Sequence, residues 1–313
     1  MKPYLSVVIP VKDEAQSLPH LWNRLALVLK NLGKTYEVIF VDDGSLDGSG
    51  RVLDTLVRRH KEVTVIEFQG NFGKSAALQA GFDAAHGEVI VTLDADLQDE
   101  PTELPKLLRK LDEGYDLVSG WKKERHDPLG KVIPSRVFNA ITALLTGVRL
   151  HDFNSGFKAY RKVVVEQFEL YGELHRFIPV FAAANRFCVT EVAVQHNPRK
   201  FGTTKYGIER VLRGFFDLIT VVFLTGYLRR PGHFFGGIGL LFFLIGLVIN
   251  GYITFIRLTT GSIQYRYPLL FLGILCIIVG VQFISTGLLA EMLTHLGAEQ
   301  KKPYVVRKVI KKS

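Results

Sequence analysis

Hydrophobic and polar positions divide the chain into two parts. Up to about residue 206, short runs of β-branched and other apolar residues alternate with longer stretches in which apolar residues recur every three or four positions. The short runs predict buried strands and the longer stretches predict amphipathic helices. Farther along, residues 234–256 and 267–290 contain no Asp, Glu, Lys or Arg. The pattern therefore predicts an α/β domain followed by two apolar helices.

The first part alternates regularly between the two kinds of element. The predicted strands are 5–10, 37–41, 63–67, 88–93 and 115–119, and the predicted helices are 14–31, 48–59, 74–85 and 102–112. Such alternation is typical of parallel strands joined by crossover helices. Ligands of these sheets bind beyond the carboxyl ends of the strands. Because Asp42 and Asp43 follow one predicted strand and Asp94 and Asp96 another, we expect the ligand site there.

Each uncharged run is long enough to cross the ~30 Å hydrocarbon core of a bilayer as a helix. Buried helices of a soluble protein are the alternative, which two such runs in tandem disfavour. Residues 207–228 form an amphipathic pattern that leads into the first run, so we expect this helix to lie in the membrane interface. For a similar stripe at 132–148, core packing is the ordinary explanation and interface binding the alternative. The predicted organisation is an α/β domain at 1–206, a juxtamembrane helix at 207–230, membrane spans at 231–257 and 267–293, and a basic tail at 294–313.

The net charge of +9 invites a nucleic-acid interpretation. Many basic residues, however, flank the apolar runs, where the positive-inside rule and anionic headgroups place them. These flanking residues are Arg229, Arg230, Lys301, Lys302, Arg307, Lys308, Lys311 and Lys312. We therefore expect an integral membrane protein with two spans, with its α/β domain and C-terminus in the cytoplasm and no nucleic-acid partner.

Two further features concern covalent structure and assembly. Cys188 and Cys276 lie far apart and indicate no disulfide framework, and no basic leader precedes the apolar stretch 5–11, so no signal peptide is predicted. In the tail, residues 304–310 alternate like a strand that would pair with a second copy of the chain. Contact of this basic tail with headgroups is the alternative, so a homo-oligomer stays open.

The acidic string Asp94-Ala95-Asp96-Leu97-Gln98 directly follows a predicted strand. Two carboxylates two residues apart repel each other unless a cation lies between them. Mg²⁺ and Mn²⁺ prefer oxygen ligands and bridge carboxylates to phosphates. Such a pair often only caps the next helix, but the strand before it and the Gln-Asp-Glu-Pro string after it make a metal site the better interpretation.

A second acidic string, from Asp42 to Gly48, also follows a strand. Acidic residues at a strand end bind ribose hydroxyls or a base edge in dinucleotide sites. A turn followed by a helix cap suits the same residues, and both interpretations can hold at once. At the end of the first strand, Pro10, Val11 and Glu14 would complete a wall around a nucleoside.

Basic residues supply candidates for binding phosphate. Lys74 follows Asn71 and Gly73 at a predicted helix start, where free N–H groups favour a phosphate, although the spacing is not that of a P-loop. The others are Arg125, Lys131, Arg136, Arg199, Lys200 and Lys205. For each of these residues alone, the default interpretation is a solvated surface position. The whole set is better explained if two phosphorylated partners meet in one site, where fixed cations stabilise the negative charge that develops on the leaving diphosphate.

Asp152 is the candidate for a general base. A phosphate monoester has a second pKa near ~6, so such an acceptor would need little help to lose its proton. Asp152 would then orient a basic residue or restrain positive charge at the reacting carbon. A loop aspartate that bonds its own backbone is the structural alternative.

Together these strings resemble the family-2 glycosyltransferases of GT-A fold. Within that family the chain looks like the dolichol-phosphate mannose synthase group, and most like its bacterial polyprenyl-phosphate glucosyltransferase branch. The motifs that carry the resemblance are Glu14 and residues 6–10, 41–45, 71–74, 93–101, 155–160 and 199–206. The resemblance covers nearly the whole chain and implies a Rossmann-like GT-A domain with a mostly parallel central sheet.

The resemblance also implies an activity. A hexose would pass from a nucleotide sugar to a polyprenyl phosphate with inversion, as a step in cell-wall or glycan biosynthesis. Glucose from UDP-glucose is favoured, and a GDP-sugar is possible. Pro10, Val11, Glu14, Asp42 and Asp43 would hold the nucleoside, and Lys74, Ala95, Arg199, Thr204 and Lys205 would complete the donor site. Asp94, Asp96 and Gln98 would hold Mg²⁺ or Mn²⁺, and Arg125, Lys131 and Arg136 would meet the acceptor. Lys158 stands where many relatives carry Arg, which removes forked hydrogen bonding.

Two alternatives remain. A processive polysaccharide synthase would carry a Gln-x-x-Arg-Trp string late in the domain, but both tryptophans, Trp22 and Trp121, come earlier. Two spans are also few for a polymer channel. A non-catalytic membrane scaffold or transport subunit would not need Asp94 and Asp96, which are intact.

Overall fold

The computed structural model describes residues 2–123, 129–198, 209–227, 231–263 and 265–297, and in a few helical segments it describes the backbone only. The chain forms two compact units, Met1–Val221 and Val222–Ser313.

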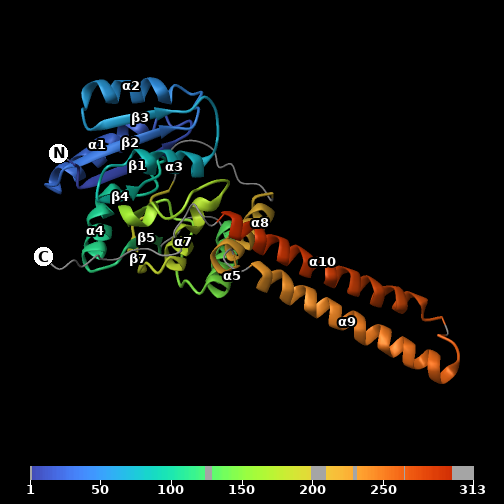
Figure 1. The fold of residues 1–313 in the computed structure, drawn as a ribbon. Coiled ribbons are helices and arrows are strands. Elements are labelled where there is room, and N and C mark those ends of the chain that lie inside the picture. Colours follow the sequence, from blue (N-terminus) through green and yellow to red (C-terminus); the bar gives the residue numbers. More distant parts are fainter. Residues whose placement is uncertain (1, 124–128, 199–208, 228–230, 264, 298–313) are drawn as a thin grey trace, which may run out of the picture. The chain divides into compact units, whose positions relative to one another are not determined.

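A seven-stranded sheet forms the centre of the first unit (Figure 1). Its strands are β1 (Leu5–Val11), β2 (Tyr36–Asp42), β3 (Val63–Glu67), β4 (Val89–Thr92), β5 (Leu117–Lys122), β6 (Lys158–Arg161) and β7 (Val189–Val194), in the order β3-β2-β1-β4-β6-β5-β7. All neighbours pair in parallel except β6, which runs antiparallel to β4 and β5. The prediction of a mostly parallel sheet in an α/β domain is confirmed.

The helices of this part of the chain are α1 (Leu18–Asn31), α2 (Ser49–Arg59), α3 (Lys74–Ala84), α4 (Leu104–Asp112), α5 (Leu129–Thr146), α6 (Lys162–Val165), α7 (Ile178–Ala184) and α8 (Glu209–Val222), with 3₁₀ turns η1 (Pro101–Glu103) and η2 (Leu174–Phe177). Among those that pack against the sheet are α2, α3, α4, α6 and α7. The apolar stripe of α1, including Leu21 and Leu25, packs in one core with Val7 and Ile9 of β1. Each such fully buried side chain stabilises the domain by about 1.5–3 kcal/mol.

Two strands were not predicted. The four residues of β6 carry Lys158 at one end and Arg161 at the other, so they lack an apolar pattern. The six residues of β7 are only partly buried before Val194. The predicted strand 115–119 lies two to three residues farther along, as β5, because residues up to Lys122 still pair with β7.

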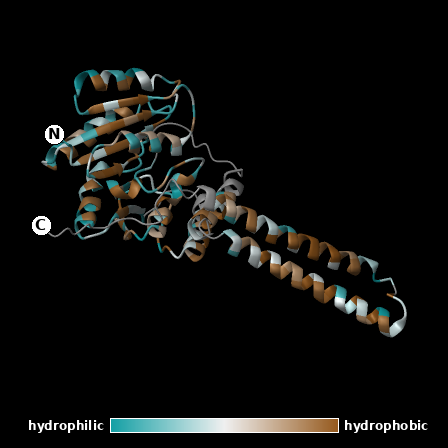
Figure 2. Ribbon diagram, viewed as in Figure 1, coloured by the Kyte–Doolittle hydropathy of each residue, from teal (hydrophilic) through white to brown (hydrophobic). Residues whose placement is uncertain are grey.

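The second unit is a helical hairpin of α9 (Pro231–Thr260) and α10 (Tyr267–Gly297), preceded by a π-helical turn η3 (Phe223–Tyr227). Both helices are long and apolar enough to cross a membrane, and most of their side chains are uncovered within the chain. Figure 2 shows apolar residues along both. Glycines seven residues apart line the contact: Gly232, Gly239 and Gly246 on α9, and Gly273, Gly280 and Gly287 on α10.

These glycines let the two backbones meet. A Cβ atom at Gly239 would lie 2.6 Å from the carbonyl oxygen of Gly280, and one at Gly246 would lie 2.6 Å from that of Gly273. No real Cβ tolerates such a distance. Close approach of this kind is how helices pack in lipid, where van der Waals contact replaces the hydrophobic effect between helices.

Candidate active site

The carboxyl ends of β1, β2 and β4 bring Pro10, Val11, Asp42, Asp43, Asp94 and Asp96, which are among the predicted donor and metal residues, to one edge of the sheet. Val11 pairs with Asp42 across β1 and β2, and Val8 pairs with Thr92 across β1 and β4. Asp94 and Asp96 follow β4 by two and four residues. The site predicted from strand ends is therefore assembled by the register of three parallel strands.

The loop after β2 is held by its own acidic residues. Asp43 accepts hydrogen bonds from the backbone N–H of Phe72 through Oδ1 (2.6 Å) and of Gly73 through Oδ2 (2.9 Å). Asp42 Oδ1 accepts one from Ser45 N–H (2.9 Å). Asp43 thus holds the loop that leads into α3. Asp42 makes the turn that the sequence allowed beside nucleoside binding, but no side chain caps the helix that follows, because Gly48 occupies the N-cap position of α2.

The loop after β1 is tied to the loop after β2. Glu14 N–H donates to Ser49 Oγ (2.8 Å), and Ala15 N–H donates to Asp47 Oδ2 (2.9 Å). The side chain of Glu14 accepts a hydrogen bond from Ser17 Oγ at 2.6 Å. The wall expected from Pro10, Val11 and Glu14 therefore borders a preformed pair of loops, which lowers the ordering that a ligand would have to impose.

The carboxylate of Asp94 lies against Lys74 and Gly156. Lys74 Nζ is 2.5 Å from Asp94 Oδ1, and each of these side chains is about 30% exposed, at 32% and 27%. Burial alone would raise the pKa of Asp94, but the Lys74 ammonium and the more distant Lys122 hold it below its ordinary value. On the other side, the Asp94 carboxylate occupies the space that the Cβ of any residue larger than Gly156 would need.

The carboxyl of Asp96 has the opposite shift. Burial, followed by the charges of Asp94 and Asp99, raises its pKa to about 6. Carboxylates that repel each other in this way are stabilised as anions by a cation. The backbone N–H of Gln98 donates to Asp96 Oδ1 at 3.2 Å, which closes the loop around the pair.

This donor set suits Mg²⁺ or Mn²⁺. In the described part of the chain, no three His, Cys, Asp or Glu side chains come close enough to hold an ion by themselves. Mg²⁺ is commonly held by one or two carboxylates together with substrate phosphates. Asp94 and Asp96, with Gln98 two residues farther along, would supply a partial site of that kind, and the missing Cβ of Gly156 leaves room for the carboxylate of Asp94.

Asp152 is buried among cations. It is 1% exposed, and its Oδ1 accepts a hydrogen bond from Asn154 N–H at 3.0 Å. Its charge raises the pKa of Lys122 and Lys158, although burial dominates at Lys158 and lowers that pKa to about 8. Lys158 Nζ also donates to the carbonyl oxygens of Phe153 and Ser155. The surroundings suit a residue that orients cations, the role that the sequence left beside that of a base.

Several predicted site residues are not tested by the structure. Arg125, Arg199, Lys200, Thr204 and Lys205 lie outside the described residues, as does the tail 298–313. Lys131 and Arg136 belong to α5, but their side chains are not described. Their roles stay predictions. Lys122 was missed, although a lysine that ends a buried strand is a signal that sequence reasoning can use.

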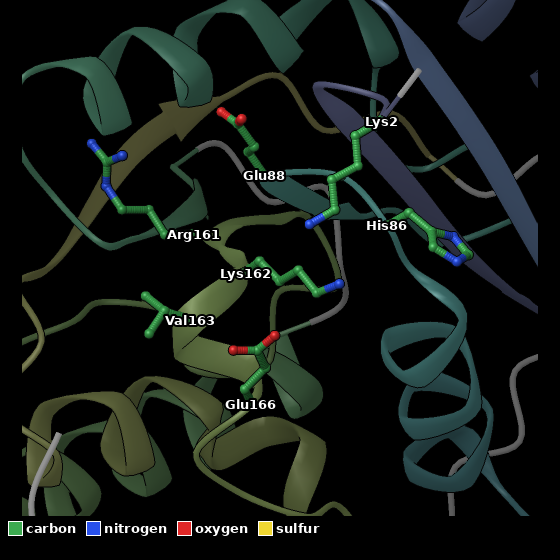
Figure 3. A pocket seen from close by; sticks show the side chains of 8 residues that line it. Lys2, His86, Glu88, Arg161, Lys162, Val163 and Glu166 are labelled. Carbon is green, nitrogen blue, oxygen red and sulfur yellow. The ribbon is translucent and has the colours of Figure 1, made fainter. Parts of the chain in front are cut away.

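A separate pocket of about 310 Å³ lies at the other edge of the sheet, near the start of β4 (Figure 3). Its lining includes Lys2, His86, Glu88, Arg161, Lys162 and Glu166. Arg161 donates to Leu111 O and Lys162 to Ala85 O, each at 2.8 Å. Because these cations bind the protein's own backbone, the pocket is a poor candidate for chemistry.

The fold and the site together define a class. A mostly parallel sheet, paired loops at the ends of β1 and β2, and a carboxylate pair after β4 are the features of a GT-A glycosyltransferase. The sequence profile described as "Glycosyl transferase family 2" matches residues 6–169. The chain belongs to this family and is a glycosyltransferase.

Curated relatives match almost the full length. A dodecaprenyl-phosphate galacturonate synthase of Rhizobium johnstonii is 38% identical over 97% of this chain and 92% of its own. An undecaprenyl-phosphate 4-deoxy-4-formamido-L-arabinose transferase of Pseudomonas aeruginosa is 36% identical over 95% and 88%. Both matches extend well beyond the α/β domain into the helical hairpin.

A solved structure supports the fold. Glucosyl-3-phosphoglycerate synthase from Mycobacterium tuberculosis, in complex with Mn²⁺ and uridine-diphosphate-glucose, superposes with a TM-score of 0.54. The match covers 71% of this chain and 79% of that chain, at 18% identity. At this identity the likeness concerns the GT-A fold.

Proposed function

We propose that the enzyme transfers a sugar from a nucleotide donor to the phosphate of a polyprenyl phosphate, at the cytoplasmic face of a membrane. The observation that carries the proposal is similarity over nearly the whole chain, hairpin included, to two transferases named for polyprenyl phosphate acceptors. The carboxylate pair after β4 and the preformed loops after β1 and β2 support a nucleotide donor.

In the proposed mechanism the lipid phosphate attacks the sugar carbon directly, with inversion. The phosphate is already largely ionised at neutral pH because the second pKa of a monoester is about 6. No residue therefore has to remove a proton, which agrees with the burial of Asp152. A divalent cation on Asp94 and Asp96 would supply charge that stabilises the leaving diphosphate. Lys74, whose ammonium lies beside Asp94, adds a fixed positive charge at the same place.

Exposed apolar side chains support attachment of the α/β unit to the bilayer. On α5, Val137, Ile141, Leu144 and Leu145 are between 42% and 82% exposed, and on α8, Phe216 and Ile219 are 64% and 46% exposed. Helices with one apolar face of this kind lie in the interface plane. Holding the active site at the surface raises the effective concentration of an acceptor that cannot leave the membrane.

The proposal includes a nucleotide sugar as donor. A UDP-sugar is favoured by the resemblance and by the UDP-glucose bound to the structural neighbour. Glucose is the sugar expected from the sequence, whereas the names of the relatives carry galacturonate and a formamido-arabinose. All three therefore belong in a test.

The test uses membranes that contain the protein, polyprenyl phosphate, Mg²⁺ and labelled nucleotide sugars, including UDP-glucose, UDP-galacturonic acid, UDP-4-deoxy-4-formamido-L-arabinose and GDP-mannose. We expect label from one donor in chloroform-soluble lipid. Asp96→Ala should abolish this label, whereas a scaffold would keep its role without the carboxylate. Incorporation into an insoluble polymer would favour a processive synthase, and no transfer from any donor would defeat the proposal.

A further inference from the structure

One buried residue of the string that carries the proposed metal carboxylates has its backbone in the left-handed region. Leu97, between Asp96 and Gln98, has φ +62° and is 4% exposed. A residue with a Cβ adopts this conformation at an energetic cost. Such a conformation persists only where the surroundings impose it, and it is typical of functional sites. The turn at Leu97 must therefore be held from outside.

Asp99, two residues after Leu97, is held by a buried ion pair and by backbone pairing. The carboxylate of Asp99 is fully buried, and its Oδ1 lies 3.0 Å from Nζ of Lys122, at the end of β5. Nδ1 of His196, just after β7, lies 4.0 Å from the same oxygen. Asp99 and His196 also form an antiparallel β-bridge, and the N–H of Asn197 donates to the carbonyl of Gln98 at 2.8 Å.

We propose that Asp99, Lys122 and His196 are positioning residues that hold the turn at Leu97, so that Asp94 and Asp96 face one divalent cation. The inference rests on the proposed function, which includes that cation. Two strand ends, from β5 and β7, thereby determine the geometry of a loop that belongs to β4. The partners of a carboxylate loop commonly set metal affinity tenfold to a hundredfold.

Lys122 offers a decisive test because two explanations predict opposite signs. Its charge lies close enough to Asp94 to lower the pKa of that carboxyl. If Lys122 acted only as a nearby positive charge, removing it would strengthen binding of a cation. If Lys122 positions the loop, removing it leaves Asp99 buried without its cation, the loop shifts, and binding weakens.

The experiment measures Mn²⁺ binding to the detergent-solubilised full chain by electron paramagnetic resonance, in the presence of UDP. Lys122→Met should weaken Mn²⁺ binding tenfold or more. The matched control is Lys110→Met, which removes an exposed lysine paired with Glu113 at 2.6 Å, and it should bind Mn²⁺ like the wild type. His196→Leu should also weaken binding, by a smaller factor than Lys122→Met, because the pair of Asp99 and Lys122 remains.

Each outcome decides a point. Unchanged or tighter Mn²⁺ binding by Lys122→Met overturns the positioning role. If that variant does not unfold cooperatively, His196→Leu decides, and wild-type affinity in this second variant overturns the role equally. A wild-type protein that binds neither Mn²⁺ nor UDP would instead defeat the proposed function, so the two failures are distinct.

Discussion

Gly156→Ala tests whether the space beside Asp94 is needed for the metal site. The new Cβ would lie 2.5 Å from Oδ1 of Asp94, whereas ordinary contact begins at 3.4 Å. The carboxylate must therefore move by roughly 1 Å, a misplacement that can cost about 10²-fold in rate. A hydrogen bond from Thr92 Oγ1 to the carbonyl oxygen of Gly156, at 2.7 Å, holds the backbone of Gly156 in place. We therefore expect the Asp94 side chain to move, and the backbone at residue 156 to stay.

We expect kcat/KM for lipid glycosylation to fall about 10²-fold and Mn²⁺ affinity to fall about tenfold or more. The overpacked side chain should also lower the free energy of unfolding by about 1–3 kcal/mol. Thermal unfolding of the variant therefore has to show that it is folded at the temperature of the assay. The control is Gly50→Ala, whose Cβ would meet its nearest neighbour, Asp42 Oδ2, at an ordinary 3.7 Å. Mn²⁺ affinity within twofold of the wild type in folded Gly156→Ala would refute the reasoning.

Three other predictions follow from the geometry. Because the pKa of Asp96 is raised from 3.8 to about 6, its carboxyl keeps the proton below pH 6, and the stability that this proton gives the folded state is lost as the pH rises from about 4 through 6. Stabilisation by Mn²⁺ in thermal unfolding should therefore grow from pH 5 to pH 7, and Asp96→Asn should remove this trend. Asp43→Ala leaves the backbone N–H groups of Phe72 and Gly73, just before α3, without their acceptor and should cost about 1–3 kcal/mol in urea unfolding, with weaker UDP binding. Equal stability would contradict the role of Asp43 in holding this loop. Gly280→Leu places a side chain where even a Cβ atom would lie 2.6 Å from Phe243 N, so it should separate α9 from α10. Cysteine pairs introduced across the two helices should therefore cross-link less in this variant than in the otherwise unchanged chain. The control is Gly251→Leu, where nothing lies within 4 Å of the added Cβ.

The sequence predicted the features that are local. Strands followed directly by Asp42 and by Asp94 identified the carboxyl edge of the sheet, and the glycine before Lys74 marked the start of α3. These predictions succeeded because a strand, its polarity and the residue after it are contiguous in the chain. The two uncharged runs predicted α9 and α10 for the same reason.

What the sequence could not show depends on contacts between distant residues. Asp99, Lys122 and His196 come from three separate segments, and each alone is an ordinary charged or polar residue. The hydrogen bond from Phe72 N–H to Asp43 likewise joins two loops that are far apart in the sequence. Strand β6 was missed because its pairing on both sides, rather than an apolar pattern, places it in the sheet.

The seven-residue spacing of glycines brings the two helices of the hairpin into backbone contact. With Gly239 against Gly280 and Gly246 against Gly273, the two backbones leave no room at these positions for an isoprenoid chain. If the hairpin spans a membrane and the acceptor is a polyprenyl phosphate, as proposed, the lipid tail would lie outside this helix pair, among the surrounding lipids.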